Sequence, residues 1–405
     1  MVSNYSSRPA WVEVNLDAIA ANIKMFIELA GSKTELMAVV KADGYGHGAA
    51  AVASTALEAG AGSLAVAFVE EGIALRRSGI RAPILLLGYT DPSRYTDLVE
   101  FNLTPTIFNI DTAACFSALA AAAGALLNVH LKVDTGMGRV GFLPTEAVAM
   151  VSSIARMPGL AAEGLFTHFA AAEDLDGAYT RQQLQLFDKI IEQCGREGIE
   201  FKKIHAANSA AAINYPRSYY NMLRLGLAMY GHYPDPGMGE ADDMPGLKPA
   251  MTFKSRVVMI KQVPPGSSIS YGCTYTTTSP ALIATVPVGY ADGYSRLLSN
   301  RGQVLIRGCR VPVVGRICMD HLMVDVTGLP GVSLNDEVVL YGRQGEETVT
   351  VEEMAAQIGT VNYELLCAID KRVPRYYFRD GFLHGIYDYF ETVDLSAGPL
   401  TLFND

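Results

Sequence analysis

Short apolar runs and longer amphipathic stretches alternate along the first 230 residues. Amphipathic stretches with apolar residues at helical spacing, such as 179–197, lie between the runs, and a further helix is expected at 16–30. Eight runs have the length of buried strands: 35–41, 63–69, 83–88, 103–108, 127–133, 161–167, 201–206 and 222–230. Eight strand–helix units favour a closed parallel barrel, although an open, doubly wound sheet has the same pattern.

The pattern changes at 233–250, a segment rich in Pro, Gly and Asp that is typical of a linker. Beyond it, a helix is expected at 351–358, and turn residues separate expected strands at 252–262, 282–288, 303–307, 310–314, 322–326 and 337–341. We therefore predict an α/β chain with an N-terminal (β/α)8 TIM-type barrel over 10–240. Residues 1–9 and 241–405 are expected to form a mainly antiparallel β domain.

Composition and charge exclude several classes of protein. Half of the 405 residues are hydrophobic, so the chain can bury a large core, and the net charge is −10. An acidic chain without a run of Lys or Arg is not expected to bind nucleic acid or anionic membranes. The first residues lack the apolar core of a secretory signal, so a cytoplasmic protein is expected. The six cysteines show no CxxC spacing, so neither a metal site nor a disulfide framework is predicted.

Polar residues follow the predicted strands directly, where barrels hold their active sites. Lys41 follows the first strand and is succeeded by Gly44, Gly46 and Gly48, which allow a ligand to approach the backbone closely. An unpaired ammonium is costly to bury, so a Schiff-base lysine is favoured over a surface lysine. Arg139 lies in a formal G-x-G-x-x-G motif after the fifth strand. Because a dinucleotide motif belongs after the first strand, we interpret Arg139 as a ligand for a carboxylate or a phenolic oxygen.

The last three barrel strands end in His168, in Asn208 and Ser209, and in Arg224. Loops after the seventh and eighth strands of such barrels often bind phosphate. A single histidine at a strand end is more often a satisfied core residue. Here it shares one predicted face with lysine, arginine, asparagine and serine, which favours a functional site.

Together these segments resemble the alanine racemase family of pyridoxal-phosphate enzymes, which combine a barrel with a β domain. The resemblance covers roughly residues 10–375 and is carried, in order, by 38–48, 131–139, 167–169, 205–209, 224–226, 270–272, 315–320, 362–364 and 372–375. It implies pyridoxal 5'-phosphate as cofactor and a homodimer with shared active sites. It also implies interconversion of L- and D-alanine, with D-alanine supplied for cell-wall peptidoglycan.

The resemblance further implies roles for individual residues. Lys41 would carry the cofactor as a Schiff base and act as the base on one face of the substrate. Tyr271 would act on the other face and be supplied by the partner subunit. Arg224 would contact the pyridine nitrogen, with His168 behind it.

The remaining roles also follow from the resemblance. The phosphate binders would be Tyr45, Ser209, Gly226, Leu227 and Tyr363, and Asn208 would flank the cofactor. Arg139 and Met319 would receive the substrate carboxylate, with Asp320 beside Met319. Lys132 matches a lysine that some members carry as a carbamate, which would hold Arg139 in place.

This set of residues has a coherent chemical logic. Racemisation requires removal of a proton from Cα on one face and its return on the other, hence two bases. Free Lys and Tyr have pKa values of about 10, so positive neighbours and a desolvated pocket are needed to lower them. An arginine keeps its proton, so Arg224 leaves the pyridine nitrogen unprotonated and weakens the cofactor as an electron sink. Simple proton exchange is then favoured over transamination.

Other activities on the same plan remain open. A serine or broad-specificity racemase is one alternative, and a non-catalytic pyridoxal-phosphate carrier is another, although such carriers lack the β domain. A decarboxylase would carry a Gly-Gly-Gly run and a Glu-Pro-Gly-Arg motif, both absent here. The aromatic tail at 376–405 extends beyond the resemblance, and we expect it to dock on the protein itself or at a dimer interface.

Overall fold

The computed structural model describes residues 8–174, 176–235, 237–238 and 246–390, which fall into two compact units. Unit 2 takes in residues 18–44 and 49–249, and unit 1 takes in the chain up to residue 17, residues 45–48 and the chain from 250 onward. None of the described helices is long and apolar enough to cross a membrane.

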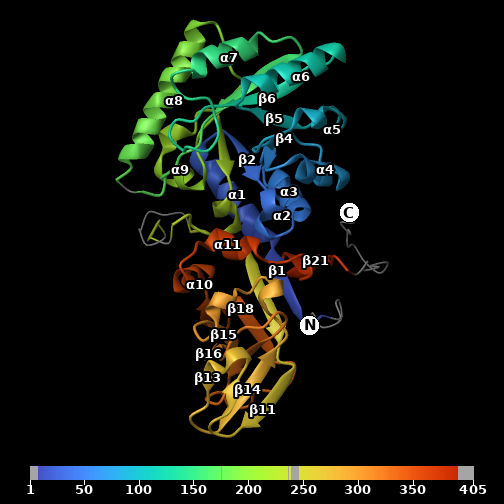
Figure 1. The fold of residues 1–405 in the computed structure, drawn as a ribbon, viewed down its shortest axis with the longest axis vertical. Helices are drawn as coiled ribbons and strands as arrows, with labels where there is room; N and C mark the ends of the chain where they lie inside the picture. Colours follow the sequence, from blue (N-terminus) through green and yellow to red (C-terminus); the bar gives the residue numbers. More distant parts are fainter. Residues whose placement is uncertain (1–7, 175, 236, 239–245, 391–405) are drawn as a thin grey trace. The chain divides into compact units, whose positions relative to one another are not determined.

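Unit 2 is a closed barrel of eight parallel strands, which confirms the predicted fold class (Figure 1). Each strand is short and buried because helices cover it from outside and neighbouring strands flank it. The strands are β2 (Glu35–Val39), β3 (Ser63–Val66), β4 (Ile84–Leu86), β5 (Thr104–Ile107), β6 (Leu127–Lys132), β7 (Leu160–Phe166), β8 (Lys203–His205) and β9 (Met222–Leu225). Pairing of Met37 with Arg224 joins β2 to β9 and closes the ring.

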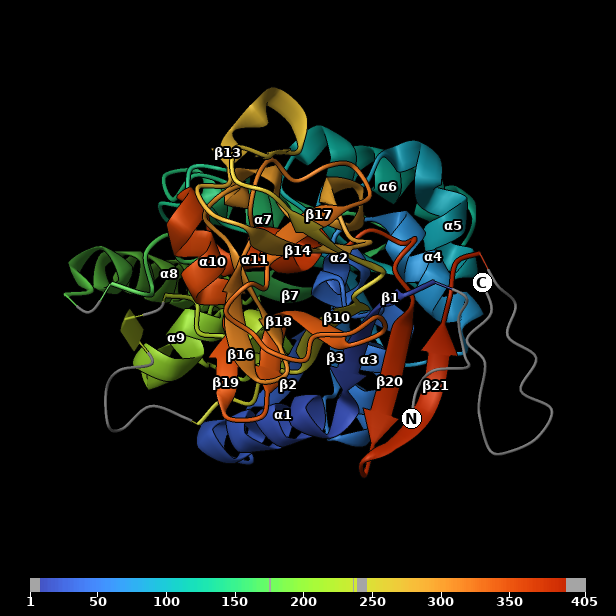
Figure 2. The same cartoon turned by 90° about the horizontal axis from the view of Figure 1, so that it is seen from below.

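Helices surround the barrel, and Figure 2 shows α4, α5 and α6 following one another along one flank. The α-helices are α1 (Leu16–Ala30), α2 (Lys41–Tyr45), α3 (Ala49–Glu58), α4 (Val69–Arg77), α5 (Tyr95–Glu100), α6 (Ile110–Ala122), α7 (Ala147–Ala155), α8 (Ala178–Arg196) and α9 (Ser209–Asn214). Short 3-10 turns are η1 (Pro92–Arg94), η2 (Pro216–Ser218) and η3 (Leu227–Tyr230). The strand predicted at 222–230 is therefore too long: it ends at Leu225, and η3 begins after Gly226, whose φ of −108° and ψ of −109° leave the strand geometry.

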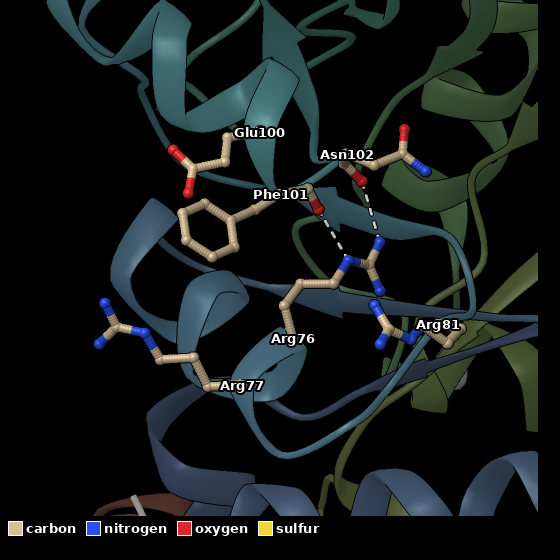
Figure 3. Close-up of a pocket in the computed structure, with 6 residues that line it drawn as sticks. All are labelled: Arg76, Arg77, Arg81, Glu100, Phe101 and Asn102. Carbon is tan, nitrogen blue, oxygen red and sulfur yellow. Dashed lines mark hydrogen bonds between the residues drawn. The ribbon is translucent and has the colours of Figure 1, made fainter.

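At the amino-end mouth of the barrel, the Arg76 guanidinium joins two loops (Figure 3). It donates to the carbonyls of Phe101 at 2.7 Å, Asn102 at 2.9 Å, Ile80 at 3.0 Å and Ala82 at 2.7 Å. These carbonyls belong to the loops that precede β4 and β5. The charge of Arg76 is buried, but its hydrogen bonds are satisfied by carbonyl groups.

A second set of polar groups at the same mouth is paired. Lys203 forms an ion pair with Glu35, and the Ser63 hydroxyl donates to the same carboxylate at 2.7 Å. All three lie at the first positions of their strands. Charge at this end of the barrel is therefore neutralised locally.

Unit 1 contains an eight-stranded sheet in the order β16-β15-β18-β10-β1-β20-β21, with β19 paired to β18. Its strands are β1 (Ala10–Asn15), β10 (Met251–Arg256), β15 (Gln303–Ile306), β16 (Cys309–Pro312), β18 (Glu337–Gln344), β19 (Glu347–Val349), β20 (Arg375–Arg379) and β21 (Phe382–Tyr387). Residues 10–15, which the predicted boundaries place in the barrel, lie instead between β10 and β20. Their alternating apolar side chains pack into the core of this sheet.

Smaller elements complete unit 1. They are a three-stranded sheet of β11 (Met259–Val263), β14 (Ala281–Val286) and β17 (Leu322–Asp325), a ribbon of β12 (Ser268–Ile269) and β13 (Tyr275–Thr276), the helices α10 (Val351–Ile358) and α11 (Asn362–Cys367), and the turns η5 (Tyr271–Cys273), η6 (Tyr290–Asp292) and η7 (Arg296–Leu298). The strand predicted at 252–262 is wrong as one element, because it breaks at 257–258 and its halves join different sheets.

The aromatic tail docks on unit 1 as far as the structure describes it. β20 pairs in parallel with β1, and β21 pairs with β20. Tyr376 stacks on Trp11 with ring centroids 6.3 Å apart. The final segment of the predicted tail, 391–405, lies outside the described residues.

Candidate active site

Lys41 follows β2 directly and opens a turn of unusual handedness. Ala42, Asp43, Gly44 and Tyr45 have φ values of 52°, 51°, 61° and 53°, so four successive residues adopt the left-handed conformation. Residues with a Cβ are disfavoured there by roughly 1–2 kcal/mol each. Such strain persists only where surrounding contacts impose it, and it is commonest at functional sites.

Three hydrogen bonds hold this turn. The Ala42 amide donates to Glu71 at 2.6 Å, the Gly44 amide donates to the Val40 carbonyl at 2.9 Å, and Asp43 accepts the Ala49 amide at 2.8 Å. The chain therefore bends sharply just past Lys41. This bend keeps the lysine half-buried at the carboxyl end of its strand.

Arg224 lies on β9, beside the strand that leads to Lys41, and is only 3 % exposed. Its Nη1 donates to His205 Nδ1 at 2.8 Å, and its Nη2 faces His168 Nδ1 at 3.1 Å and the carbonyls of Thr167 and Ala206 at 3.0 and 2.9 Å. A guanidinium only donates, so His205 Nδ1 accepts and His205 carries its proton on Nε2. The two hydrogens of Nη2 are shared among the two carbonyls and His168. The Nε–H of Arg224 and one Nη1–H keep no acceptor among the described residues.

Positive charge accumulates at this mouth, and the Asp134 carboxylate offsets only part of it at Lys132. Burial and Arg139 lower the pKa of Arg224 to about 9. Burial, Arg139 and Arg224 lower the pKa of Lys132 to about 7. Lys132 makes no ion pair with any described residue, and its Nζ lies 5.5 Å from the Phe166 ring centroid. Burial and the neighbouring cations, Lys41 among them, hold the pKa of His168 well below its usual range. A small anion would be attracted to this mouth.

The loop that carries Arg139 is organised by one carboxylate. Asp134 accepts the backbone amides of Gly136, Met137 and Gly138 at 3.0, 2.7 and 3.0 Å, and that of Arg139 at 3.0 Å. A dinucleotide loop would offer such amides to phosphate, whereas here the chain satisfies them itself. The Arg139 guanidinium is exposed and makes no hydrogen bond or ion pair to a described residue, which leaves it available for a ligand.

The loops after β8 and β9 meet through Ser209. Its Oγ accepts the amides of Gly226 at 3.0 Å and Ala228 at 3.3 Å, and the Asn208 side chain caps α9. The amides of Ser209 and Leu227 stand at the first positions of α9 and η3, where no intrahelical acceptor exists. These donors fit a phosphate group, in the loops where barrels of this kind bind one.

The remaining predicted site residues belong to unit 1, and Tyr271 is the most exposed of them at 72 %. It lies in η5 between Ser270 and Gly272, whose φ values of 65° and 72° make a tight turn. Ser270 donates to the Arg316 carbonyl, and the Arg316 guanidinium covers Gly272 so closely that a Cβ there would come within 2.7 Å of it. The turn therefore holds Tyr271 out from the surface of unit 1.

Met319 and Asp320 follow one another on an exposed loop of unit 1. Asp320 forms an ion pair with Arg372 at 2.6 Å, and Arg372 also bonds the buried Asp292 at 2.7 Å. Hydrogen bonding to Asp292 and Asp320 raises the pKa of Arg372. Asp320 is thus held by the chain itself, beside Met319.

Tyr45 and Tyr363 come together in unit 1. Their ring centroids lie 6.2 Å apart, and Tyr45 is buried. Gly46 permits this approach, because a Cβ there would lie 2.3 Å from the carbonyl of Leu366 on α11, the helix that also carries Tyr363. The structure thus pairs two of the predicted phosphate binders.

Sequence reasoning did not single out three residues that pack around Arg224. His205 and His130 continue its hydrogen bonds, and Phe166 lies 5.4 Å from its guanidinium carbon. The signal in the sequence was a histidine between apolar residues of the strand at 127–133. A buried histidine is usually a satisfied core residue, so the strand alone did not reveal its partner.

A parallel barrel with cations and spare hydrogen-bond donors at one mouth, in one chain with an antiparallel β unit, is typical of a two-domain enzyme with a site for an anionic group. The model of the alanine racemase N-terminal domain matches residues 14–234, and that of the C-terminal domain matches 250–377. The chain belongs to the alanine racemase family and is therefore an isomerase.

Individual proteins that resemble the chain are also alanine racemases. The chain is 48 % identical to the alanine racemase of Desulforamulus reducens, covering 91 % of this chain and 99 % of that one. It is 45 % identical to the alanine racemase of Halothermothrix orenii, covering 92 % and 97 %. Among solved structures, alanine racemase of Clostridium difficile 630 has a TM-score of 0.89 at 40 % identity, with 95 % and 100 % covered. The Bacillus anthracis enzyme with bound L-Ala-P has a TM-score of 0.90 at 39 % identity, with 95 % and 98 % covered.

Proposed function

We propose that this protein interconverts L- and D-alanine with pyridoxal 5'-phosphate as cofactor and supplies D-alanine for peptidoglycan. One observation carries the proposal: Lys41 follows β2, and the adjacent strand β9 holds Arg224 with uncommitted donors. The solved relative with bound L-Ala-P supports a substrate of alanine size.

The donor groups of the barrel fit this cofactor. Ser209 and Leu227 provide amides for its phosphate, and Arg224 keeps N–H groups for its pyridine nitrogen. Lys41 would hold pyridoxal phosphate covalently, and the cofactor would supply an acceptor for the electron pair left on Cα when the proton is removed. Tyr45 and Tyr363 are proposed as further phosphate ligands, with Gly226 in the same loop and Asn208 beside the cofactor.

The chain's own residues would move the protons. We propose that the Lys41 amine takes the Cα proton on one face, while the Tyr271 hydroxyl delivers a proton on the other, and that the reverse direction exchanges these roles. Tyr271 is held out from unit 1, which suits a side chain that completes the site of a second copy, so a homodimer is proposed. Arg139 and Met319 would receive the substrate carboxylate, and Asp320 would keep its loop in place through Arg372.

Arg224 would fix the electronic character of the site. It is buried among neutral histidines and carbonyl groups, and its role as donor leaves the pyridine nitrogen as an acceptor. A protonated ring would withdraw electrons more strongly and favour transamination. Simple proton exchange is therefore the expected outcome.

Lys132 is proposed to carry a carbamate. With its pKa near 7, a large fraction of its amine is neutral at neutral pH. A neutral amine adds to carbon dioxide and loses one proton, which gives an anionic carbamate. Arg139 and Arg224, whose charges act on Lys132, would stabilise that anion, and Arg139 would be held in place.

Two other activities remain candidates. A serine or broad-specificity racemase would use the same groups with a wider pocket, whereas a carrier would not require Tyr271.

A cytoplasmic location is proposed because all six cysteines are free thiols, as expected in a reducing compartment.

The absorbance of the purified protein tests the proposal. We expect a yellow protein that converts L-alanine to D-alanine, and loss of colour and of activity in Lys41→Ala. Tyr271→Phe should keep the colour and lose racemisation. A yellow protein inert towards alanine would point to another amino acid or a carrier, and a protein that pyridoxal phosphate cannot reconstitute would contradict the assignment of Lys41.

A further inference from the structure

A chain of hydrogen bonds runs from Arg224 through the interior of the barrel to His130. His205 accepts from Arg224 at its Nδ1, at 2.8 Å, and its Nε2 lies 2.9 Å from His130 Nδ1. The two histidines are 0 % and 4 % exposed, on β8 and β6. Nothing in the proposed proton transfers uses His130.

The direction of every hydrogen bond in this chain is determined by its first member. Arg224 donates only, so His205 must accept at Nδ1 and carry its proton on Nε2. His205 therefore donates to His130 Nδ1, and His130 carries its proton on Nε2. Burial, Lys203 and Arg224 lower the pKa of His130 to about 3, and burial and Arg224 hold that of His205 well below its usual range. Both rings stay neutral at physiological pH, so protonation does not reverse the chain.

Packing leaves the two rings little freedom. The Phe166 ring stacks on His205 with centroids 4.6 Å apart and planes at 7°, and the Arg224 guanidinium lies over the same ring. Gly164 makes room for His130, because a Cβ at 164 would lie 2.5 Å from its Nδ1. The ring of His130 can therefore occupy this position only because residue 164, on the neighbouring strand, has no side chain.

His130 also lines a cavity at the amino-end mouth of the barrel. The cavity has a volume of about 190 Å³, and its lining includes Asn128, Glu163 and Lys203. It is large enough to hold water. Water there would provide an acceptor for the Nε2–H of His130 without competing for Nδ1.

We propose that His130 is a positioning residue: by accepting the Nε2–H of His205, it fixes the tautomer that keeps Arg224 oriented. Without that acceptor, His205 can place its proton on Nδ1, where it would oppose an N–H of Arg224. The Arg224 guanidinium would then rotate. Its free N–H groups would no longer point in the direction that they have in the wild type. The expected effect on cofactor binding rests on the proposed function. The expected tautomer of His205 depends only on its hydrogen bonds to Arg224 and His130.

Two variants separate the acceptor from the bulk of His130. His130→Phe keeps a ring but removes the acceptor, and His130→Asn retains an acceptor oxygen near the position of Nδ1. Nitrogen-15 shifts of the seven histidines in the purified, cofactor-loaded protein report the tautomer of His205. We expect a single Nε2–H form in the wild type and in His130→Asn, and a mixture in His130→Phe.

The cofactor gives a second readout. In His130→Phe we expect the dissociation constant of pyridoxal phosphate to rise about 3- to 10-fold, as for the loss of one buried hydrogen bond. We expect kcat to fall about 10- to 100-fold with little change in KM, because misorientation acts on the chemical step. His130→Asn should restore most of both values. The proposal would be overturned if His130→Phe and His130→Asn lowered Tm equally while the nitrogen-15 shifts of His205 and the dissociation constant of pyridoxal phosphate stayed unchanged.

Gly164→Ala displaces the His130 ring without changing any hydrogen-bonding atom. It should reproduce the mixed tautomer and the weaker cofactor binding. Gly195→Ala is the matched control, since a Cβ at 195 meets nothing within 4 Å, and it should behave as the wild type. A wild-type His205 tautomer in Gly164→Ala would count against positioning by His130. If the protein failed to bind pyridoxal phosphate at all, the tautomer measurement would still decide the proposal.

Discussion

The cations at the two mouths of the barrel differ in whether the chain itself provides their partners. At the amino end, Lys203 is paired with Glu35, and Arg76 donates to four carbonyls. At the carboxyl end, Lys132 makes no ion pair with a described residue, and Arg224 keeps N–H groups without a described acceptor. The same two residue types therefore stabilise one mouth and leave the other charged and ready to bind.

The difference shows which end of the barrel is organised for binding. Burial and Arg139 lower the pKa values of both Lys132 and Arg224, and Arg224 lowers that of Lys132 further. Strained backbone after Lys41 is found at the same end. Unpaired cations and strained backbone lower the stability of the protein without a ligand. A bound anion would offset the repulsion between the cations.

Replacement of Arg224 should produce the largest effect. In Arg224→Lys the charge stays but the planar fork is lost, so the contacts to His205 and His168 cannot both be made. We expect kcat/KM for alanine to fall about 100- to 1000-fold. The matched Arg76→Lys variant should keep wild-type kcat/KM, and an equal loss in both variants would remove the contrast between the mouths.

Arg76→Ala tests the structural role of the amino end. Four carbonyls would lose their donor, one in a buried and three in partly buried hydrogen bonds, and we expect the free energy of unfolding to fall by about 3 kcal/mol. Arg77→Ala, at the exposed neighbouring position, should change it by no more than about 0.5 kcal/mol. Chemical denaturation measures both. Full stability in Arg76→Ala would show that the carbonyls find other donors.

The pH dependence of stability distinguishes the two lysines. The folded pKa of Lys132, about 7, lies below its ordinary value of 10.5, so the unfolded chain binds more protons between these values and stability rises with pH across that window. Lys132→Met should remove this rise and stabilise the protein at pH 6 by about 1–3 kcal/mol. Lys203→Met should instead destabilise it slightly, because Glu35 loses its partner. Denaturation in bicarbonate-free buffer provides the measurement.

Asp134→Asn should give the smallest effect. Burial raises the pKa of Asp134, but the amides of its loop together lower it below the usual range. Its contribution is present above pH 4 and is lost as the pH falls through the lower folded value. We expect a loss of about 1 kcal/mol at pH 7 that shrinks as the pH falls through the lowered folded pKa of Asp134. A constant difference across this range would show that the carboxylate charge is unimportant.

The barrel and its mouth could be predicted because both depend on local signals. Buried strands appear as apolar runs, and the residues that follow them must share one end of a closed parallel barrel. Lys41, Arg139 and Arg224 were found in this way. Ser209 and Gly226 were found because they follow the last two strands.

Features that depend on distant pairing were not predictable in this way. His130 and His205 are 75 residues apart, and neither strand alone shows the direction of their hydrogen bond. The strand expected at 252–262 broke because its two halves pair with different strands. The extension of the last barrel strand to 230 failed at Gly226, where the backbone turns before the apolar run ends.

The pairing of β1 with β10 has a consequence during synthesis. Val14 pairs with Met251, so β1 can pair with β10 only after roughly 240 more residues have been synthesised. At ribosomal rates of about 5–20 residues per second, that delay is roughly 10–50 s. During this time the barrel segment can fold, while the apolar strand with Trp11 remains an open edge that invites pairing with other chains. β1 is therefore exposed to pairing with other chains during synthesis, and a chaperone that shields it should raise the yield.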